Sequence, residues 1–419
     1  MRAIFVILAA LLLLPLVSPS NYAQSTWNIQ TVTSRGAVAT FCPIAIDSRN
    51  TPHIAYTELK ETWGNDHEIS FPVYYASLDE KGWNSQAVGF GRADSIVLDK
   101  QDNPHLIYVE NYKGLMYAKL VGTKWIMEVI DPNVAVYNNG FGTLAIDSEN
   151  FTHIAFTNGN ALFYGVRTQS NNWTIELVFN ESTVKLSRAP LTLDSDKNPY
   201  LLWYNSKGVQ LTHIQNSSFA TETIDSNITG IGNIVLDSNG YPNIVYTKNF
   251  ENNSAVVYAI WTGSVWEKQT VYSTTKTTYD SVSTLTLDSY NYPHVSYVVD
   301  AGKLAYARWT GINWDIQTVD SDLGWLGGFS YLALDSNGNL HISYCGINYP
   351  AGDIRYATSE ALTPIYTPPT LSSSTPSTSA FPDQNLLLLV VIIIVLTFAI
   401  VTLLIVFKGH RKNVKLKEL

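Results

Sequence analysis

The feature that most constrains this 419-residue chain is a phrase that recurs seven times. Each copy reads apolar, any residue, apolar, Asp, then a short turn, often Pro and His, and a strand that ends in an aromatic residue. A repeat of this length indicates one large array rather than several unrelated domains. The leading acids lie 43 to 52 residues apart, at Asp47, Asp99, Asp147, Asp194, Asp237, Asp288 and Asp335.

Two further aromatic positions complete the repeat. A third predicted strand carries tyrosine, at Tyr117, Tyr164, Tyr258, Tyr306 and Tyr356. A fourth carries tryptophan, at Trp83, Trp125, Trp173, Trp266 and Trp314, with Phe219 in the fourth copy. Four short strands every 48 residues or so are typical of a propeller blade. The sequence therefore predicts an all-β fold, a seven-bladed β-propeller over residues 25–362.

The two ends of the array complement each other. The seventh copy runs into a Pro-rich segment without its Trp strand, while residues 25–32 at the other end, STWNIQTV, match the fourth-strand segments WEKQTV and WDIQTV. The N-terminal strand is therefore predicted to complete the last blade and close the ring, which removes exposed strand edges.

On these repeats the chain resembles the seven-bladed β-propeller superfamily over residues 25–362. Within it, the chain is similar to poorly characterised secreted and membrane-anchored propeller-repeat proteins of bacteria and archaea, with turns of the type Asp-x-x-Gly-x-Pro-His. The sialidase pattern Ser-x-Asp-x-Gly-x-Thr-Trp and the Gly-His and Trp-Asp pairs of WD40 repeats are absent. The resemblance implies a fold and little about activity.

The seven leading aspartates precede Ser, Asn or Gly-rich turns, where a carboxylate accepts hydrogen bonds from backbone N–H groups. A structural role in an Asx turn is the leading interpretation. Calcium binding is the alternative, with Asp194-x-Asp196-x-Asn198 as the best spacing, but the Gly and the distal Glu of a calcium loop are missing.

Histidine occupies one repeat position in five copies, and Tyr200 and Asn243 replace it in the other two. Copies of one position lie at different azimuths around a ring and do not converge on one metal ion. We interpret them as turn-packing residues, and the sequence predicts no metal site, no cofactor and no catalytic residue. The five are His53, His105, His153, His294 and His341.

Residues that differ between copies are the candidates for function. In propellers, by fold analogy, partners bind the face formed by the loops from strand four to the next strand one and from strand two to strand three. Aromatic side chains there suit sugar faces or protein hot spots, and scattered surface aromatics are the alternative. The candidate binding residues are Trp63, His67, Tyr112, Tyr137, Phe250, Tyr279, Trp325 and Tyr349.

Two covalent features are predicted for an exported chain. Cys42 and Cys345 belong to the first and seventh copies, which are neighbours in a closed ring, and are a candidate disulfide. Six Asn-x-Ser/Thr sequons are candidate glycosylation sites, at Asn150, Asn172, Asn180, Asn216, Asn227 and Asn252.

Both ends of the chain carry targeting patterns. Residues 1–23 read as a secretory signal peptide. Residues 386–407 are uncharged, lack Pro and Gly, and form a segment long enough to span a bilayer. The basic tail 408–419 is predicted to lie in the cytoplasm. Residues 363–384, rich in Pro, Ser and Thr, read as an extended stalk. These patterns predict a type I protein of the plasma membrane with an extracellular propeller.

Charge excludes one class of partner. The segment between signal and membrane span has 20 Lys and Arg against 34 Asp and Glu, a net charge of −14, whereas nucleic-acid binders need a basic footprint. Seven arginines lie in this segment, too few for an evident cluster, and no nucleophile elbow, phosphate loop or redox Cys pair occurs.

The leading hypothesis is a non-enzymatic, monomeric surface module for glycan or protein partners. An extracellular glycosidase or lyase, or a structural envelope component, are the alternatives.

Overall fold

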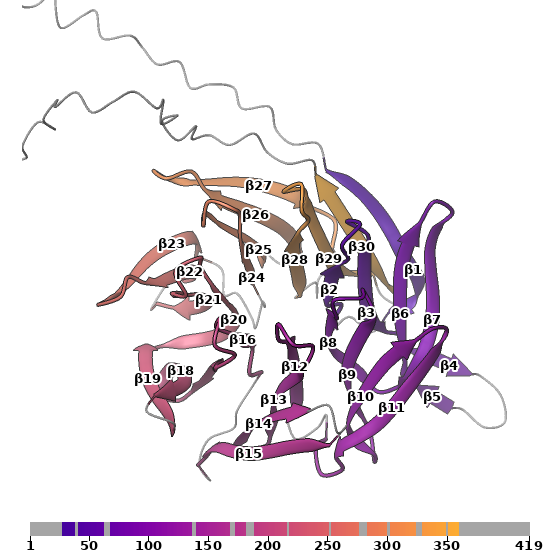
Figure 1. The fold of residues 1–419 in the computed structure, drawn as a ribbon. Coiled ribbons are helices and arrows are strands. Elements are labelled where there is room, and N and C mark those ends of the chain that lie inside the picture. Colours follow the sequence, from indigo (N-terminus) through magenta and orange to yellow (C-terminus); the bar gives the residue numbers. More distant parts are fainter. Residues whose placement is uncertain are drawn as a thin grey trace, which may run out of the picture. The chain divides into compact units, whose positions relative to one another are not determined.

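The computed structural model describes residues 27–37, 41–62, 68–135, 140–167, 172–181, 188–215, 218–250, 253–275, 283–299, 302–323, 329–348 and 351–359. These residues all belong to one unit, Met1–Tyr366. They form seven four-stranded antiparallel sheets and one two-stranded hairpin, and the sheets stand around a common axis (Figure 1). The prediction of an all-β, seven-bladed β-propeller is confirmed.

Each blade uses four strands, of which the first lies nearest the axis (Figure 1). Blades one to three comprise β2 (Ile44–Ile46), β3 (Pro52–Thr57), β6 (Pro72–Asp79) and β7 (Gly82–Phe90); β8 (Arg92–Leu98), β9 (Pro104–Glu110), β10 (Gly114–Val121) and β11 (Lys124–Asp131); and β12 (Phe141–Ile146), β13 (Thr152–Asn158), β14 (Ala161–Arg167) and β15 (Trp173–Asn180).

Blades four to six comprise β16 (Leu191–Leu193), β17 (Pro199–Asn205), β18 (Gly208–Gln215) and β19 (Ser218–Asp225); β20 (Ile228–Leu236), β21 (Pro242–Asn249), β22 (Ser254–Trp261) and β23 (Trp266–Thr274); and β24 (Thr284–Leu287), β25 (Pro293–Val299), β26 (Lys303–Trp309) and β27 (Trp314–Asp320). Blade seven comprises β28 (Ser330–Leu334), β29 (Leu340–Asn348), β30 (Ala351–Ser359) and β1 (Asn28–Ala37). A hairpin inserted in blade one comprises β4 (Lys60–Thr62) and β5 (Glu68–Ser70).

Side chains near the axis join the innermost strands of neighbouring blades. Asp94 Oδ2 accepts a hydrogen bond from Gly142 N at 3.0 Å, and Ser95 Oγ accepts one from Leu144 N at 3.2 Å. Because the partners advance in the same order along both strands, the two strands run in the same direction. Similar bridges join Asn233 to Leu285 and Thr284 to Leu332. The first residues of the innermost strands therefore gather at one end of the axis.

Each leading aspartate holds the turn that follows the innermost strand. The Oδ1 atom of Asp99 accepts hydrogen bonds from Gln101 N at 3.0 Å and Asn103 N at 2.9 Å. The same two bonds, from the residues two and four positions further on, occur in all seven copies. The residue between these two donors has φ of 61° to 81° in every copy, which explains why Asn, Asp and Gly prevail there.

Aromatic pairs fill the interfaces between blades. The third-strand tyrosine of one blade packs edge-on against the fourth-strand aromatic residue of the next, with ring centroids 5.2 to 6.0 Å apart and planes at 68° to 79°. This edge-to-face geometry is the one that aromatic quadrupoles favour. The pairs are Tyr75–Trp125, Tyr117–Trp173, Tyr164–Phe219, Tyr258–Trp314, Tyr306–Trp27 and Tyr356–Trp83.

The N-terminal strand β1 forms the outer edge of blade seven, paired antiparallel with β30. Trp27, directly before β1, occupies the repeat position of the fourth-strand tryptophans, against Tyr306 of blade six. Trp83 of blade one donates a hydrogen bond to Gln30 Oε1 at 3.2 Å. The prediction that the N-terminal strand completes the last blade is confirmed.

The two cysteines lie beside this closure, buried between blades one and seven. Their Sγ atoms are 3.5 Å apart and both are free thiols. Ser343 Oγ donates a hydrogen bond to Cys42 O at 2.5 Å, which ties the same two blades together. Burial and the neighbouring Cys345 raise the pKa of Cys42 well above its usual value, so its thiol stays protonated.

In an oxidising exterior we expect these two thiols to be joined, because their sulfur atoms are already neighbours at 3.5 Å. Non-reduced peptide mapping of the exported protein should then recover one linked pair of peptides containing Cys42 and Cys345. The Cys345→Ser variant is the control and should leave Cys42 as a free thiol. Recovery of both free thiols from the exported wild-type protein would refute this expectation.

The predicted signal peptide, stalk, membrane span and basic tail all lie outside the described residues and stay predictions. Within the described part of the chain, no helix is long and apolar enough to cross a membrane.

Candidate binding cleft between the fourth and fifth blades

The structure describes two of the eight loop residues predicted to bind a partner. Tyr112 lies in the turn between β9 and β10, has φ of 70° and is 96% exposed. Phe250 follows β21, is 53% exposed, and lies 5.7 Å below the ammonium nitrogen of Lys248. They belong to blades two and five, which are not neighbours, so they do not form one site. Trp63, His67, Tyr137, Tyr279, Trp325 and Tyr349 lie outside the described residues.

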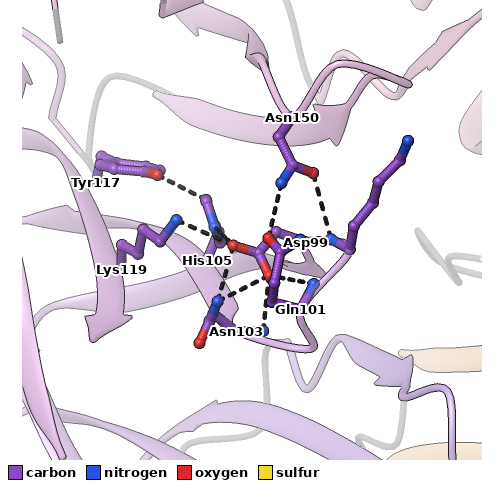
Figure 2. A network of polar contacts seen from close by, with 8 residues as sticks. Asp99, Gln101, Asn103, His105, Tyr117, Lys119 and Asn150 are labelled. Atoms are coloured by element: carbon purple, nitrogen blue, oxygen red, sulfur yellow. Dashed lines mark hydrogen bonds and ion pairs between the residues drawn. The ribbon is translucent and has the colours of Figure 1, made fainter. Parts of the chain in front are cut away.

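The repeated histidines are buried inside the blades. His105 Nδ1 lies 2.6 Å from Tyr117 Oη, and His105 Nε2 lies 3.3 Å from Asp99 Oδ2 (Figure 2). In the other four copies the corresponding distances are 2.5 to 2.6 Å and 3.4 to 3.5 Å. An Asp–His–Tyr chain has the groups of a proton relay, but these histidines are buried and both ring nitrogens face the Asp and Tyr of their own blade.

Burial lowers the histidine pKa in four of these relays, and hydrogen bonds outweigh burial and lower the aspartate pKa in all five. Burial, assisted by Lys119, lowers the pKa of His105 to about 4. Burial alone would raise the pKa of Asp99, but hydrogen bonds from Asn103 and Lys119 hold it well below its usual value (Figure 2). No group of three or more His, Cys, Asp or Glu side chains in the described ranges is arranged to hold a metal ion.

The turns between the first and second strands of neighbouring blades are joined to each other by side-chain hydrogen bonds, which we call clasps. Asn150 Oδ1 accepts a hydrogen bond from Lys100 N at 3.3 Å, and Asn150 Nδ2 donates to Gln101 Oε1 at 2.9 Å (Figure 2). In each of these clasps the left-handed residue of one turn supplies the side chain. Equivalent clasps join Ser48 to Asp102, Ser238 to Asn291 and Ser336 to Asn50.

The interface between blades four and five departs from the repeat at three positions. Tyr200 stands where five blades have histidine, and Leu211 stands at the position of the third-strand tyrosine. Gly240 occupies the left-handed position of the fifth turn and has no side chain with which to form a clasp. The interface has therefore lost one aromatic ring and one polar bridge.

A cleft of about 420 Å³ opens at this interface. Tyr200 and His213 stack on one side, with centroids 5.1 Å apart and planes 11° apart. Trp261 lies on the other side, 5.7 Å from Trp266 between ring centroids. The lining residues are Tyr200, Leu211, His213, Gln215, Ala220, Thr221, Glu222, Asn239, Gly240, Tyr241, Pro242 and Trp261.

The cleft combines aromatic surfaces with uncharged and acidic hydrogen-bonding groups. Glu222 is exposed and its Oε1 accepts a hydrogen bond from Trp266 Nε1 at 3.4 Å. Tyr241 is 38% exposed. Among the described residues that line the cleft, Glu222 is the one carboxylate, and Lys and Arg are not represented.

The cleft lies on the opposite face from the predicted binding loops. Its fifth-blade wall is the turn between β20 and β21, whereas Tyr112 and Phe250 lie in turns between second and third strands. The sequence carries one signal for the cleft, because Tyr200 replaces the repeated histidine in the fourth copy and lines the cleft. A substitution at one repeat position does not by itself distinguish a ligand site from a change in packing.

A second hollow, of about 560 Å³, lies on the same face of blade one. It is lined by residues 49–53 and 77–80, which include Arg49, Asp79 and Glu80 and no tryptophan or tyrosine. It therefore lacks the aromatic walls of the cleft between blades four and five.

The described sequons lie at the surface or close to it. Asn172, Asn180 and Asn227 are exposed, whereas Asn150 is half-buried in its clasp. Asn216 and Asn252 lie outside the described residues. Glycosylation stays a prediction.

No protein-family model matches the sequence, and no curated protein matches it. Solved structures match the fold at low identity. A polysaccharide lyase superposes with a TM-score of 0.51 at 8% identity, over 81% of this chain and 100% of that chain. The SapL1 lectin in complex with alpha methyl fucoside has a TM-score of 0.49 at 13% identity, over 69% of this chain and 98% of that chain. The Aleuria aurantia lectin has a TM-score of 0.45 at 14% identity, over 66% of this chain and 97% of that chain. At these identities the likeness concerns the fold alone, and the chain is a seven-bladed β-propeller.

Proposed function

We propose that this chain is a cell-surface propeller that binds carbohydrate, without turning it over, in the cleft between blades four and five. The observation that carries the proposal is the set of aromatic walls, Trp261, Tyr241 and Tyr200, beside the polar groups of His213 and Glu222. Aromatic rings cover the apolar face of a sugar, and nearby imidazole, amide and carboxylate groups bond its hydroxyls.

The size of the cleft favours a small ligand over a protein. Its volume of about 420 Å³ falls in the range of small-molecule sites, about 300 to 1,000 Å³. A stable protein interface covers about 800 Å² on each partner, which a cleft of this kind does not offer by itself.

The chemistry of the cleft favours binding over hydrolysis. Glycosidases use two carboxylates about 5 to 10 Å apart. Glu222 is the one carboxylate among the described lining residues. The lyase and lectin structures share only the fold with this chain, so the proposal depends on the side chains of the cleft.

The proposed location comes from the sequence at the two ends. An exported chain with an apolar span at residues 386–407 and a stalk at residues 363–384 would display the propeller outside the cell, at the plasma membrane. An acidic propeller repels an acidic surface, which favours neutral sugars as ligands of the cleft.

Replacing Trp261 tests the proposal. A glycan array with the purified full-length chain should identify a ligand, and Trp261→Ala should weaken its binding about tenfold or more, because an aromatic wall supplies much of the contact. Isothermal titration with the array hit measures the loss.

Trp309→Ala is the matched control, because Trp309 packs on Trp314 in blade six with the same centroid geometry, 5.6 Å, and should leave binding unchanged. Equal binding by wild type and Trp261→Ala would exclude the cleft as the site. Turnover of the bound glycan by the wild-type chain would replace binding with catalysis as the function.

A further inference from the structure

One repeat position lies at the end of the axis where the innermost strands begin. Arg92 and Phe141 are the first residues of β8 and β12, and Phe41, Arg188 and Phe329 lie just before β2, β16 and β28. Phe41 contacts Phe141 and Phe329, with ring centroids 5.8 Å and 4.6 Å apart. Aromatic residues from three blades therefore meet at this end of the axis, together with two arginines.

The first of these arginines is neutralised within the protein. Arg92 Nε lies 2.6 Å from Asp94 Oδ1 and Arg92 Nη2 lies 3.0 Å from Asp94 Oδ2, a bidentate pair. Its Nη2 also donates to Gly140 O. The guanidinium carbon stacks 4.0 Å from the centroid of Phe141. Arg92 is 9% exposed and fully engaged, so its role is structural.

The second arginine has no such partner. Two residues after Arg188 the chain has Pro190, where two residues after Arg92 it has Asp94. The guanidinium carbon of Arg188 lies 5.1 Å from the ring centroid of Phe41. Its Nη1 atom is buried and has no hydrogen-bond partner among the described residues. Thr143 Oγ1 donates to Ala189 O at 2.6 Å, which fixes the backbone beside it.

A second polar group without a partner lies next to Arg188. Tyr331 of blade seven has its ring centroid 5.5 Å from the guanidinium carbon of Arg188 and is 8% exposed. Its hydroxyl is buried and unpaired within the described part of the chain. Burial raises the pKa of Tyr331 well above its usual value, so the hydroxyl keeps its proton. Arg188 thus reaches across the axis from blade four and meets blades one and seven.

We propose that Arg188 and Tyr331 form a binding site for one oxyanion group of a ligand, a carboxylate or a sulfate ester. A guanidinium whose Nη1 is buried without a hydrogen-bond partner is costly, and an oxyanion supplies both the charge and the acceptor lone pairs that Arg188 and Tyr331 lack. The planar guanidinium, held over the ring of Phe41, suits a planar carboxylate or two oxygens of a sulfate. The site is separate from the cleft and does not depend on the proposed function.

Titration with simple anions tests the site. The purified full-length chain is titrated calorimetrically with sodium sulfate and with D-glucuronate at constant ionic strength, and with neutral D-glucose. We expect saturable binding of at least one anion and weakening of that binding at least tenfold in Arg188→Gln. Lys124→Gln removes one exposed positive charge from β11 and should bind the anion as wild type does. Binding of sulfate alone points to a sulfate ester, and binding of glucuronate alone to a carboxylate.

A melting experiment without added anion separates a binding role from a structural one. If Arg188 serves to bind a ligand, the Arg188→Gln variant should melt at the wild-type temperature or above, because the substitution removes an uncompensated charge. Tyr331→Phe should also weaken anion binding. Absence of saturable binding by wild type, or equal binding by wild type and Arg188→Gln, would overturn the proposal. The proposal would also be overturned if Trp261→Ala abolished glucuronate binding and Arg188→Gln left it intact, because the glucuronate would then bind in the cleft.

Discussion

A variant that lacks residues 25–33 should melt about 10 °C or more below the wild-type protein. The deletion removes most of β1 and leaves the edge of β30 in blade seven unpaired. It also removes Trp27 from Tyr306, and the acceptor of the Trp83 hydrogen bond, Gln30. Loss of one buried aromatic contact and one strand pairing amounts to about 5 kcal/mol. Thermal unfolding followed by circular dichroism measures the change.

Point variants of the same strand provide the matched control. Trp27→Ala should reproduce a substantial part of the loss, whereas Ile29→Thr, at a side chain that is 42% exposed, should change the melting temperature little. The deletion variant should also self-associate more than wild type, because an open strand edge templates pairing. An unchanged melting temperature in the deletion variant would show that β1 does not close the ring.

Acidification from pH 7 to pH 4 should destabilise the propeller well before its carboxylates titrate. Burial lowers the pKa values of His53, His105, His153 and His341 in the folded state, for His105 to about 4. Between that value and the unfolded pKa of about 6.5, the unfolded chain binds more protons, so stability falls as the pH falls. For His105 alone this amounts to about 3 kcal/mol at the acid end of the window. Urea unfolding at a series of pH values measures it.

Below about pH 4 a second loss should follow. The folded-state pKa values of Asp47, Asp99, Asp147, Asp288 and Asp335 are lowered. Stability from these groups is present above their unfolded pKa, about 3.9, and is lost as the pH falls through the folded values.

The chain itself suggests the control for the histidine effect. Asn243 replaces histidine in blade five, and its Oδ1 still accepts the hydroxyl hydrogen bond of Tyr258. His105→Asn should therefore fold and should lose part of the stability change between pH 7 and pH 4. An unchanged pH dependence in His105→Asn would show that His105 does not contribute to it.

The repeat made the blade count, the swapped strand and the aspartate turns predictable, because each depends on contacts that recur in every copy. Trp27 could be placed in the last blade because six other copies show what its position requires. The cleft could not be predicted in the same way. Leu211 and Gly240 matter only because a tyrosine ring and an asparagine amide fill the equivalent space elsewhere, and that space becomes evident only when neighbouring blades are in contact.

The arginines illustrate the same limit. The number of arginines between the signal peptide and the membrane span, seven, is evident from the sequence and argues against a cluster that binds an acidic ligand. A count does not reveal that Arg188 crosses the axis to Tyr331, since these residues are separated by three blades of sequence. Nor does it distinguish Arg188 from Arg92, whose carboxylate partner follows it by two residues.

The cleft between blades four and five lies where a tyrosine ring and a turn clasp are both missing, and the same two side chains could be removed at another interface of the ring. Within the described residues, six interfaces have a tyrosine ring packed against the next blade, and four have a hydrogen-bonded turn clasp. At the interface of blades six and seven, Gly338 already stands at the clasp position, and Tyr306 still packs against Trp27. A ring built this way can gain, lose or relocate a ligand site through two substitutions, while the blades, the turns and the closure stay as they are.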